Sequence, residues 1–327
     1  MGADHQGDGH QAGLSAAVAG RRLVLKTFAG LAVAKGLPVW AQDAQMLETI
    51  PLWPGTPPDG PGPSGPEATS AKGSVTRVVE PRLRVYLPAQ SNGCAMLVIA
   101  GGGYAHIECG HESTPAARWL QAQGVTAFEL VYRLPREGWA QPLVPLQDGQ
   151  RAMRLIRAGA QSFGIDAARI GVLGFSAGAH LAGMTAVAPD APRYAPVDAA
   201  DAVSARPDCA ALIYPVLTML PPFDHTHARR ELLGARRSAA AGEALSVEML
   251  VTPAAPPMFL AQAVDDTVSP VDNSLRMFAA LRQAKVAAAL HLFTTGQHGW
   301  GMGPPGSEVA AWPGLFATWA GQHRWWR

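Results

Sequence analysis

The sequence predicts an α/β protein with a doubly wound, mostly parallel sheet covered by helices on both faces. Two observations carry this prediction: short, fully apolar runs recur along the chain, and amphipathic segments of helical periodicity separate them. Composition agrees, because 48% of the 327 residues are hydrophobic and only 16% are charged, which is enough apolar material for a sizeable core. The formal net charge is +1 without a long basic run, so the sequence offers no electrostatic basis for binding nucleic acid.

The apolar runs are the expected buried parallel strands, because a parallel sheet covered on both faces needs apolar residues on both sides. These runs are 95–100, 126–131, 170–173, 210–216, 258–264 and 287–293. Helices are expected over 115–123 and 146–163, and another from Ser269-Pro270, each from its apolar spacing or its terminal residues. Broken alternation over 75–87 predicts edge strands bent at Pro81.

Residues 1–41 are interpreted as an export signal. Arg21-Arg22 precede a short apolar run, and Val39-Trp40-Ala41 gives a small-x-small cleavage pattern. The pattern resembles a twin-arginine signal, which predicts the twin-arginine translocase as an export partner and a periplasmic or secreted bacterial protein. An Ala-rich helix of the mature chain is one alternative. A membrane anchor is another, but the apolar stretch is short and Lys26 and Lys35 interrupt it.

The rest of the chain is expected to form one catalytic domain over 73–327, preceded by a Pro/Gly-rich extended arm over 42–72. The three cysteines, Cys94, Cys109 and Cys209, have the spacing of neither a zinc site nor a disulfide framework. A chain that does not depend on disulfides fits export in the folded state.

A candidate nucleophile lies in the segment Gly174-Phe175-Ser176-Ala177-Gly178. This GxSxG pattern is weak alone, but an apolar strand precedes it and a small-residue helix follows it, as in a nucleophile elbow. Ser176 would sit on the sharp strand-to-helix turn, and the Ala177 amide at the helix N-terminus would face a developing oxyanion. The alternative is a Gly-rich packing turn.

A serine nucleophile needs a base that a carboxylate orients, and in this fold the chain order is Ser, acid, His. Asp265-Asp266 follow the next-to-last strand, and His298 follows the last strand in a glycine-rich loop. Successive residues leaving a strand point in opposite directions, so only one aspartate can face His298. Asp266 is the expected acid, and Asp265 is expected to bind loop amides. Of the other histidines, His180 follows the nucleophile by one helical turn and is expected to pack locally.

The second oxyanion donor is expected in Ala100-Gly101-Gly102-Gly103-Tyr104, which follows an apolar strand. Its glycines would expose N–H groups without side-chain obstruction, so either Gly102 or Gly103 completes the oxyanion hole. Tyr104 and Trp300, in the loops that carry the oxyanion donors and the base, are the candidate substrate-binding side chains.

Two polar clusters could suggest a metal, but neither has the spacing of a familiar zinc site. They are His106, Glu108, Cys109, His111 and Glu112, and His225-Thr226-His227. A solvated loop or a pocket wall is the favoured interpretation of both, and no metal or other cofactor is expected.

The chain resembles the BD-FAE-like branch of α/β-hydrolases, which contains acetyl xylan and feruloyl esterases. The resemblance rests on GGGY at 101–104, YRLP at 132–135, PLQDGQRAMRLIR at 145–157, DAARIGVLGFSAGAHLAG at 166–183, ELLG at 231–234, and the DDTVSP and LHLFTTGQHGWG segments. It implies Ser176 as nucleophile, Asp266 as acid and His298 as base. Two positions depart from the usual pattern: Ala179 replaces a second glycine after the elbow, and Ala100 stands where Pro or His is common.

The predicted function is a serine carboxylic-ester hydrolase that deacylates acetylated or feruloylated xylan, oligosaccharides or small short-chain esters. The alternatives are a general short-chain carboxylesterase and a prolyl-oligopeptidase-like peptidase, although the chain before the first strand is too short for a propeller or gating domain. A lipase would need a long apolar lid, and segment 217–256 is too polar for one. A catalytically inactive binding module is disfavoured by the complete triad.

Overall fold

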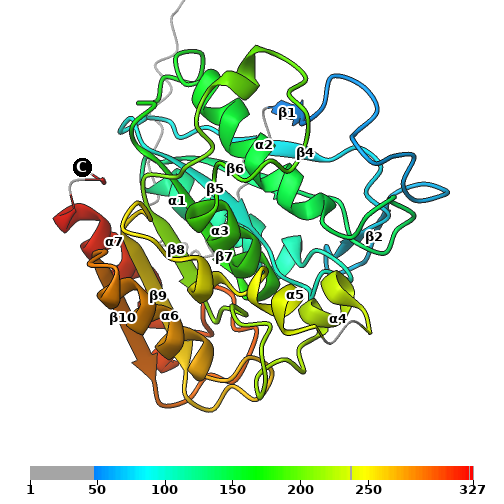
Figure 1. Cartoon of the computed structure of the whole chain (residues 1–327). Coiled ribbons are helices and arrows are strands. Elements are labelled where there is room, and N and C mark those ends of the chain that lie inside the picture. Colours follow the sequence, from blue (N-terminus) through cyan, green and yellow to red (C-terminus); the bar gives the residue numbers. More distant parts are fainter. Residues whose placement is uncertain (1–47, 236–237, 324, 327) are drawn as a thin grey trace, which may run out of the picture. The chain divides into compact units, whose positions relative to one another are not determined.

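An eight-stranded sheet runs through the computed structural model, which describes residues 48–235, 238–323 and 325–326 (Figure 1). The strand order is β1-β4-β6-β5-β7-β8-β9-β10. The six strands from β6 to β10 are mutually parallel, whereas β4 pairs antiparallel with both β1 and β6. The bounds are β1 Glu48–Pro51, β4 Arg82–Tyr86, β5 Ala95–Ile99, β6 Thr126–Val131, β7 Ile170–Phe175, β8 Ala210–Ile213, β9 Met258–Ala263 and β10 Ala288–Phe293. The predicted mostly parallel sheet is confirmed.

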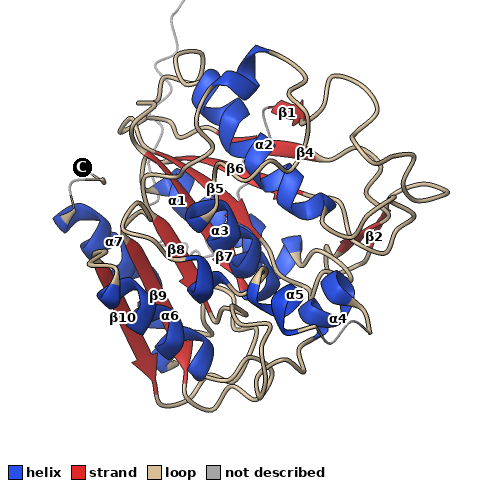
Figure 2. Cartoon of the chain, viewed as in Figure 1, coloured by secondary structure: helices blue, strands red, loops and turns tan. Residues whose placement is uncertain are grey.

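Helices cover both faces of this sheet (Figures 1 and 2). α2 (Val144–Ala158), α3 (Ser176–Val187) and α6 (Asp272–Gln283) pack on one face, and α1 (Thr114–Ala122) and α7 (Trp312–Gln322) on the other. The strands supply both cores by alternation: Leu97 and Ile99 of β5 face the first group, while Met96 and Val98 face the second. The doubly wound architecture follows from this two-sided burial.

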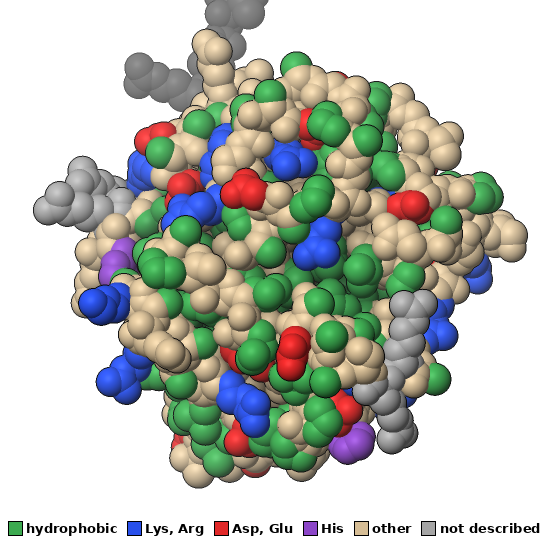
Figure 3. All heavy atoms as spheres, in the orientation of Figure 1, with side chains coloured by type: hydrophobic (Ala, Val, Ile, Leu, Met, Phe, Trp, Pro, Cys, Tyr) green, Lys and Arg blue, Asp and Glu red, His purple; other side chains and the backbone are tan. Residues whose placement is uncertain are grey.

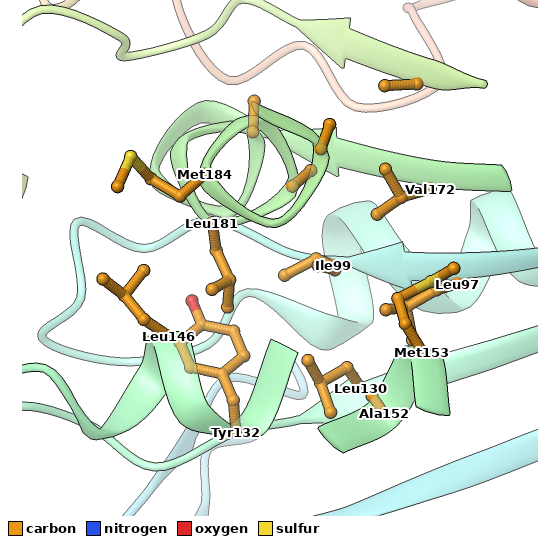
Figure 4. Packing of buried hydrophobic residues seen from close by; sticks show 14 of the residues in the cluster. Leu97, Ile99, Leu130, Tyr132, Leu146, Ala152, Met153, Val172, Leu181 and Met184 are labelled. Carbon is orange, nitrogen blue, oxygen red and sulfur yellow. The ribbon is translucent and has the colours of Figure 1, made fainter. Parts of the chain in front are cut away.

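The larger core lies beneath the helix that carries Ser176 (Figure 4). Leu97 and Val172 from the strands meet Leu181 of α3 and Met153 of α2, and all four side chains are fully buried. Burying one such side chain stabilises the fold by about 1.5–3 kcal/mol. The helix behind the nucleophile is therefore anchored by packing along its length.

Several short elements complete the fold. A small second sheet pairs β2 (Ala68–Thr69) with β3 (Val75–Thr76). The segment 217–256, expected to be polar and without a lid, holds α4 (His227–Leu233), α5 (Ala239–Glu243) and the 3₁₀ turn η4 (Val247–Leu250). Further single turns are η2 (Cys109–Ser113), η3 (Ala199–Ala202) and η5 (Glu308–Ala311), of which η2 is a π-helix.

The chain before β4 differs from the expected extended arm. Residues 51–66 have almost no regular structure, as predicted, but β1 pairs with β4 and supplies the edge strand of the main sheet. Leu52 and Trp53 are buried, and the Trp53 indole donates to Asp148 of α2 at 3.0 Å. From residue 48 onward the predicted arm is thus built into the sheet and its core.

The strand predicted over 210–216 ends early, at Ile213. Tyr214 turns the chain with φ of 37°, and Pro215, which has no N–H for a sheet hydrogen bond, follows it. This early end places the Tyr214 side chain at the carboxyl edge of the sheet.

The face of the molecule in Figure 3 shows acidic and basic side chains interspersed among apolar ones. In the described part of the chain, no helix is long and apolar enough to cross a membrane. The predicted export signal, with Arg21, Arg22 and the cleavage position after Ala41, lies outside the described residues.

Candidate active site

The nucleophile elbow is a tight turn between β7 and α3. Ser176 has φ of 50°, a left-handed conformation that is costly for a residue with a side chain. The turn is possible because its neighbours are small: a Cβ atom on Gly178 would lie 2.4 Å from the carbonyl oxygens of Ile99 and Ala100. The strain is held in place by β5, which lies directly against the turn.

The three predicted triad residues form one hydrogen-bonded chain. Ser176 Oγ lies 2.7 Å from His298 Nε2, and His298 Nδ1 lies 2.7 Å from Asp266 Oδ2. The Asp266 side chain is fully buried, whereas the His298 ring is partly exposed. A base in contact with the serine hydroxyl and an acid that orients the base are the arrangement needed to activate a serine.

The two adjacent aspartates have separate roles. Asp266 accepts hydrogen bonds from the amides of Val268 and Ser269 and from the Gln262 side chain, in addition to His298. These donors fix the carboxylate as an acceptor toward the imidazole. Asp265 is exposed and accepts from the Gln297 amide at 2.7 Å, so it holds the loop that carries His298, as the sequence predicted.

The loop of residues 100–104, here called the oxyanion loop, lies against the serine. A Cβ atom on Gly101 would lie 2.8 Å from Ser176 Cβ, so only glycine allows this approach. Gly102 and Gly103 have φ of 108° and 64°, and within the described residues their N–H groups have no protein acceptor. The Ala177 amide lies at the start of α3, where no carbonyl precedes it in the helix. The candidate oxyanion donors are therefore the amides of Gly102, Gly103 and Ala177.

Both candidate substrate-binding side chains are corrected by the structure. Tyr104 is fully buried, and its hydroxyl contacts His180 Nδ1 at 2.9 Å, so it anchors the oxyanion loop to α3. Trp300 is 5% exposed and packs against Tyr214 with ring centroids 4.5 Å apart. Neither ring presents a free face to a substrate, because both are buried. The sequence placed them in the right loops but could not show which way they point.

His180 is a buried structural residue, as its spacing predicted. Its Nε2 donates to the Leu245 carbonyl at 2.8 Å, so its Nδ1 accepts from the Tyr104 hydroxyl. Burial lowers the pKa of His180 to about 4. The neutral ring therefore joins α3, the oxyanion loop and the segment just before η4.

Neither predicted polar cluster forms a metal centre in the described residues, where no three His, Cys, Asp or Glu side chains are placed to share an ion. His106 bonds to Glu108 at 2.7 Å, and Cys109 is buried with its thiol pKa raised by desolvation. His111 donates to the Gly299 carbonyl, and His227 lies against Gly103 and near Glu231. Of these side chains, His111 and His227 thus lie against the loops that carry His298 and the candidate oxyanion donors.

Two further residues at the site were not predicted. Glu112, flagged only as a possible ligand, is buried and accepts a hydrogen bond from the Gly101 amide. Tyr214 donates its hydroxyl hydrogen bond to Glu112, and its ring lies 5.1 Å from the His298 ring. Burial raises the pKa of the Glu112 carboxyl, an effect that its donors and the nearby His298 partly oppose. The signal that could have found Tyr214 is its position after a core strand, at the same sheet edge as the triad.

Residues 83–281, more than half of the chain, match the BD-FAE family. The chain belongs to the BD-FAE family. Its matched region ends before His298, so the family match covers the elbow and the acid, and the structure adds the base.

The chain is also similar to solved and curated proteins. An acetyl ester-xyloside bifunctional hydrolase from Caldicellulosiruptor lactoaceticus is 34% identical with a TM-score of 0.74, over 85% of this chain and 97% of that one. Endo-1,4-beta-xylanase B of Butyrivibrio fibrisolvens is 39% identical over 62% of this chain and 32% of its own length. An acetylxylan esterase of Xylanibacter ruminicola is 28% identical over 67% of this chain and 43% of its own length. The chain thus spans less than half the length of these two curated relatives.

Proposed function

We propose that this BD-FAE family member is a serine carboxylic-ester hydrolase that works through an acyl-enzyme. The observation that carries the proposal is the unbroken hydrogen-bond chain from Ser176 through His298 to Asp266. Esterase chemistry needs no group beyond this triad and donors for the oxyanion, and both are built from this chain.

In the first half-reaction, Ser176 Oγ attacks the acyl carbon while His298 Nε2 takes its proton. The Asp266 carboxylate stabilises the imidazolium and holds the ring in the reactive tautomer. The negative charge on the former carbonyl oxygen is stabilised by the Ala177 amide and by Gly102 or Gly103. His298 then protonates the leaving alcohol. In the second half-reaction His298 activates a water, which releases the acid and restores Ser176.

The proposed substrates are acetylated xylan, acetylated xylo-oligosaccharides or other short-chain esters. Support comes from the relatives, whose names include an acetylxylan esterase and an acetyl ester-xyloside hydrolase. A hydrolysis panel of acetyl, butyryl, octanoyl and feruloyl esters together with acetylated xylan tests this proposal. We expect acetate release from acetylated xylan to exceed octanoyl hydrolysis. A rate that rises from acetyl to octanoyl would contradict it, and preference for small aryl acetates over xylan would favour a general short-chain carboxylesterase.

We also propose that the protein is exported by the twin-arginine translocase and acts in the periplasm or outside the cell. The proposal rests on Arg21-Arg22 and the apolar run that follows them. Replacing both arginines by lysine should retain folded precursor in the cytoplasm, and fractionation with an esterase assay measures this. Undiminished periplasmic enzyme in the double-lysine variant would refute the assignment.

A further inference from the structure

Two loops that reach the site from opposite directions meet at one buried carboxyl group. The first is the oxyanion loop, residues 100–104, and the second is the loop of residues 294–303, here called the base loop because it carries His298. Glu112 Oε2 accepts from the Gly101 amide at 2.5 Å, and Glu112 Oε1 lies 2.8 Å from the Tyr214 hydroxyl. The Tyr214 oxygen in turn accepts from the Gly301 amide at 3.1 Å. A continuous path of hydrogen bonds therefore joins the two loops.

The direction of each bond in this path is determined by its donors. Gly101 and Gly301 present N–H groups, which can only donate. Tyr214 accepts from Gly301, so its single proton is free to point to Glu112. Both Glu112 oxygens are thus acceptors, a role that a carboxylate fills and that a glutamine can fill with only one of its two terminal atoms.

The path is well suited to fix positions because its side chains are buried. Glu112 is 3% exposed and Tyr214 is fully buried. Glu112 belongs to the π-helix η2, and Tyr214 lies at the left-handed turn after β8, so each is held by a special backbone conformation. Hydrogen bonds to a carboxylate are stronger than those between neutral groups.

The two ends of the path lie next to groups whose relative positions matter for catalysis. Gly101 immediately precedes Gly102 and Gly103 and touches Ser176, while Gly301 lies three residues after His298. The Tyr214 ring also packs against the His298 ring. A displacement of about 1 Å between a nucleophile, its base and an oxyanion donor can cost 10²-fold in rate.

We propose that Glu112 and Tyr214 are positioning residues that hold the oxyanion loop and the base loop at the separation needed for catalysis. They act through Gly101 and Gly301 and do not touch the reacting atoms. The inference rests on the proposed serine-ester hydrolysis but not on which natural ester is used, so a simple aryl acetate suffices to test it.

The test compares Glu112→Gln, Tyr214→Phe and the double variant with wild type on p-nitrophenyl acetate. We expect kcat to fall by about 10- to 100-fold in each single variant while KM changes less than about twofold, because the loss is confined to the transition state. The kcat of the double variant should be only slightly lower than that of the less active single variant, since one path joins both residues. Affinity for an aryl trifluoromethyl ketone, whose adduct with Ser176 carries an oxyanion, should fall by a factor similar to that in kcat.

Asp208→Asn is the matched control. Asp208 is also a carboxylate removed from full exposure, and it accepts from the Ile170 amide and from Arg157 at the opposite end of β7 from Ser176. We expect this variant to lower the melting temperature while kcat stays within about twofold of wild type. Its result separates loss of positioning from loss of stability.

Three outcomes would overturn the inference. They are kcat within twofold of wild type in folded Glu112→Gln and Tyr214→Phe, an equal kcat loss in Asp208→Asn, or unchanged affinity for the trifluoromethyl ketone. If Glu112→Gln does not fold, Tyr214→Phe decides alone, because it removes a single oxygen atom. A wild-type enzyme that neither hydrolyses the acetate nor reacts with a fluorophosphonate would instead refute the proposed function.

Discussion

The elbow and the base loop hold the two partners of one hydrogen bond, yet they are built in different ways. The elbow is local: β7, the strained Ser176 and the small residues of α3 lie within a few positions of one another in sequence. The base loop has no regular structure and is held by contacts from distant segments. Its anchors are Asp265 on the Gln297 amide, His111 on the Gly299 carbonyl, Tyr214 on the Gly301 amide, Trp312 on the Gly301 carbonyl and Glu308 on the Thr294 amide.

This difference teaches that a nucleophile can be read from a short motif, whereas the position of its base depends on residues spread over the chain. The elbow tolerates little change because backbone atoms crowd it. The base loop distributes its support over several anchors, so the loss of one anchor should cost less than the loss of the elbow geometry.

The largest expected effect is at the elbow itself. Ser176→Ala should lower kcat by about 10⁶-fold, as removal of the nucleophile does in other triad enzymes, while the fold remains. Ester hydrolysis and circular dichroism of the purified variant measure both effects. Wild-type activity in a folded Ser176→Ala protein would exclude the serine mechanism.

The next effect separates the two aspartates that serve the base. Asp266→Asn keeps the shape but offers His298 the wrong hydrogen-bond partner, which should cost about 10⁴ in turnover. Asp265→Asn removes one anchor of the base loop and should cost less than about tenfold, together with a lower melting temperature. Turnover of both variants decides the assignment, and a larger loss at residue 265 than at residue 266 would reverse it.

Two glycine substitutions test whether the elbow is more crowded than the base loop. In Gly101→Ala the new Cβ would lie 2.8 Å from Ser176 Cβ and from the Phe175 carbonyl oxygen, so we expect a loss of about 100-fold in kcat/KM. In Gly299→Ala no atom lies within 4 Å of the new Cβ, and only the positive φ of 74° opposes it. That variant should lose about 1 kcal/mol of stability and less than about fivefold in activity. Equal losses at both positions would remove the proposed contrast.

The smallest expected effect is on how strongly the stability of the folded protein depends on pH, and it comes from His180 in the helix that follows the elbow. The pKa of His180 is lowered to about 4 in the folded protein, whereas an unfolded histidine has a pKa of about 6.5. Between these values the unfolded chain binds a proton that the folded protein does not, so stability falls as the pH falls from 6.5 to about 4. His180→Gln should reduce that fall, by at most about 1.4 kcal/mol per pH unit. Chemical unfolding of both proteins at pH 7, 6 and 5 measures this difference, and parallel curves would contradict it.

By itself the sequence determined the fold class, the six parallel strands and the residues of the triad. It could do so because buried strands, an elbow and polar residues after strands leave local patterns of apolar runs, glycines and spacing. Ser176 directly follows β7, and Asp266 and His298 lie three and five residues after the ends of β9 and β10. A parallel sheet brings such residues together at its carboxyl edge.

Only the tertiary structure decided how the loops around the triad are held. The roles of Glu112 and Tyr214, and the inward orientation of Tyr104 and Trp300, depend on partners about 75 to 100 residues away in several cases. Likewise, β1 became part of the sheet through pairing with β4, although its own sequence has no strand pattern. Such contacts depend on which surfaces the folded chain brings together, and no local periodicity in the sequence predicts them.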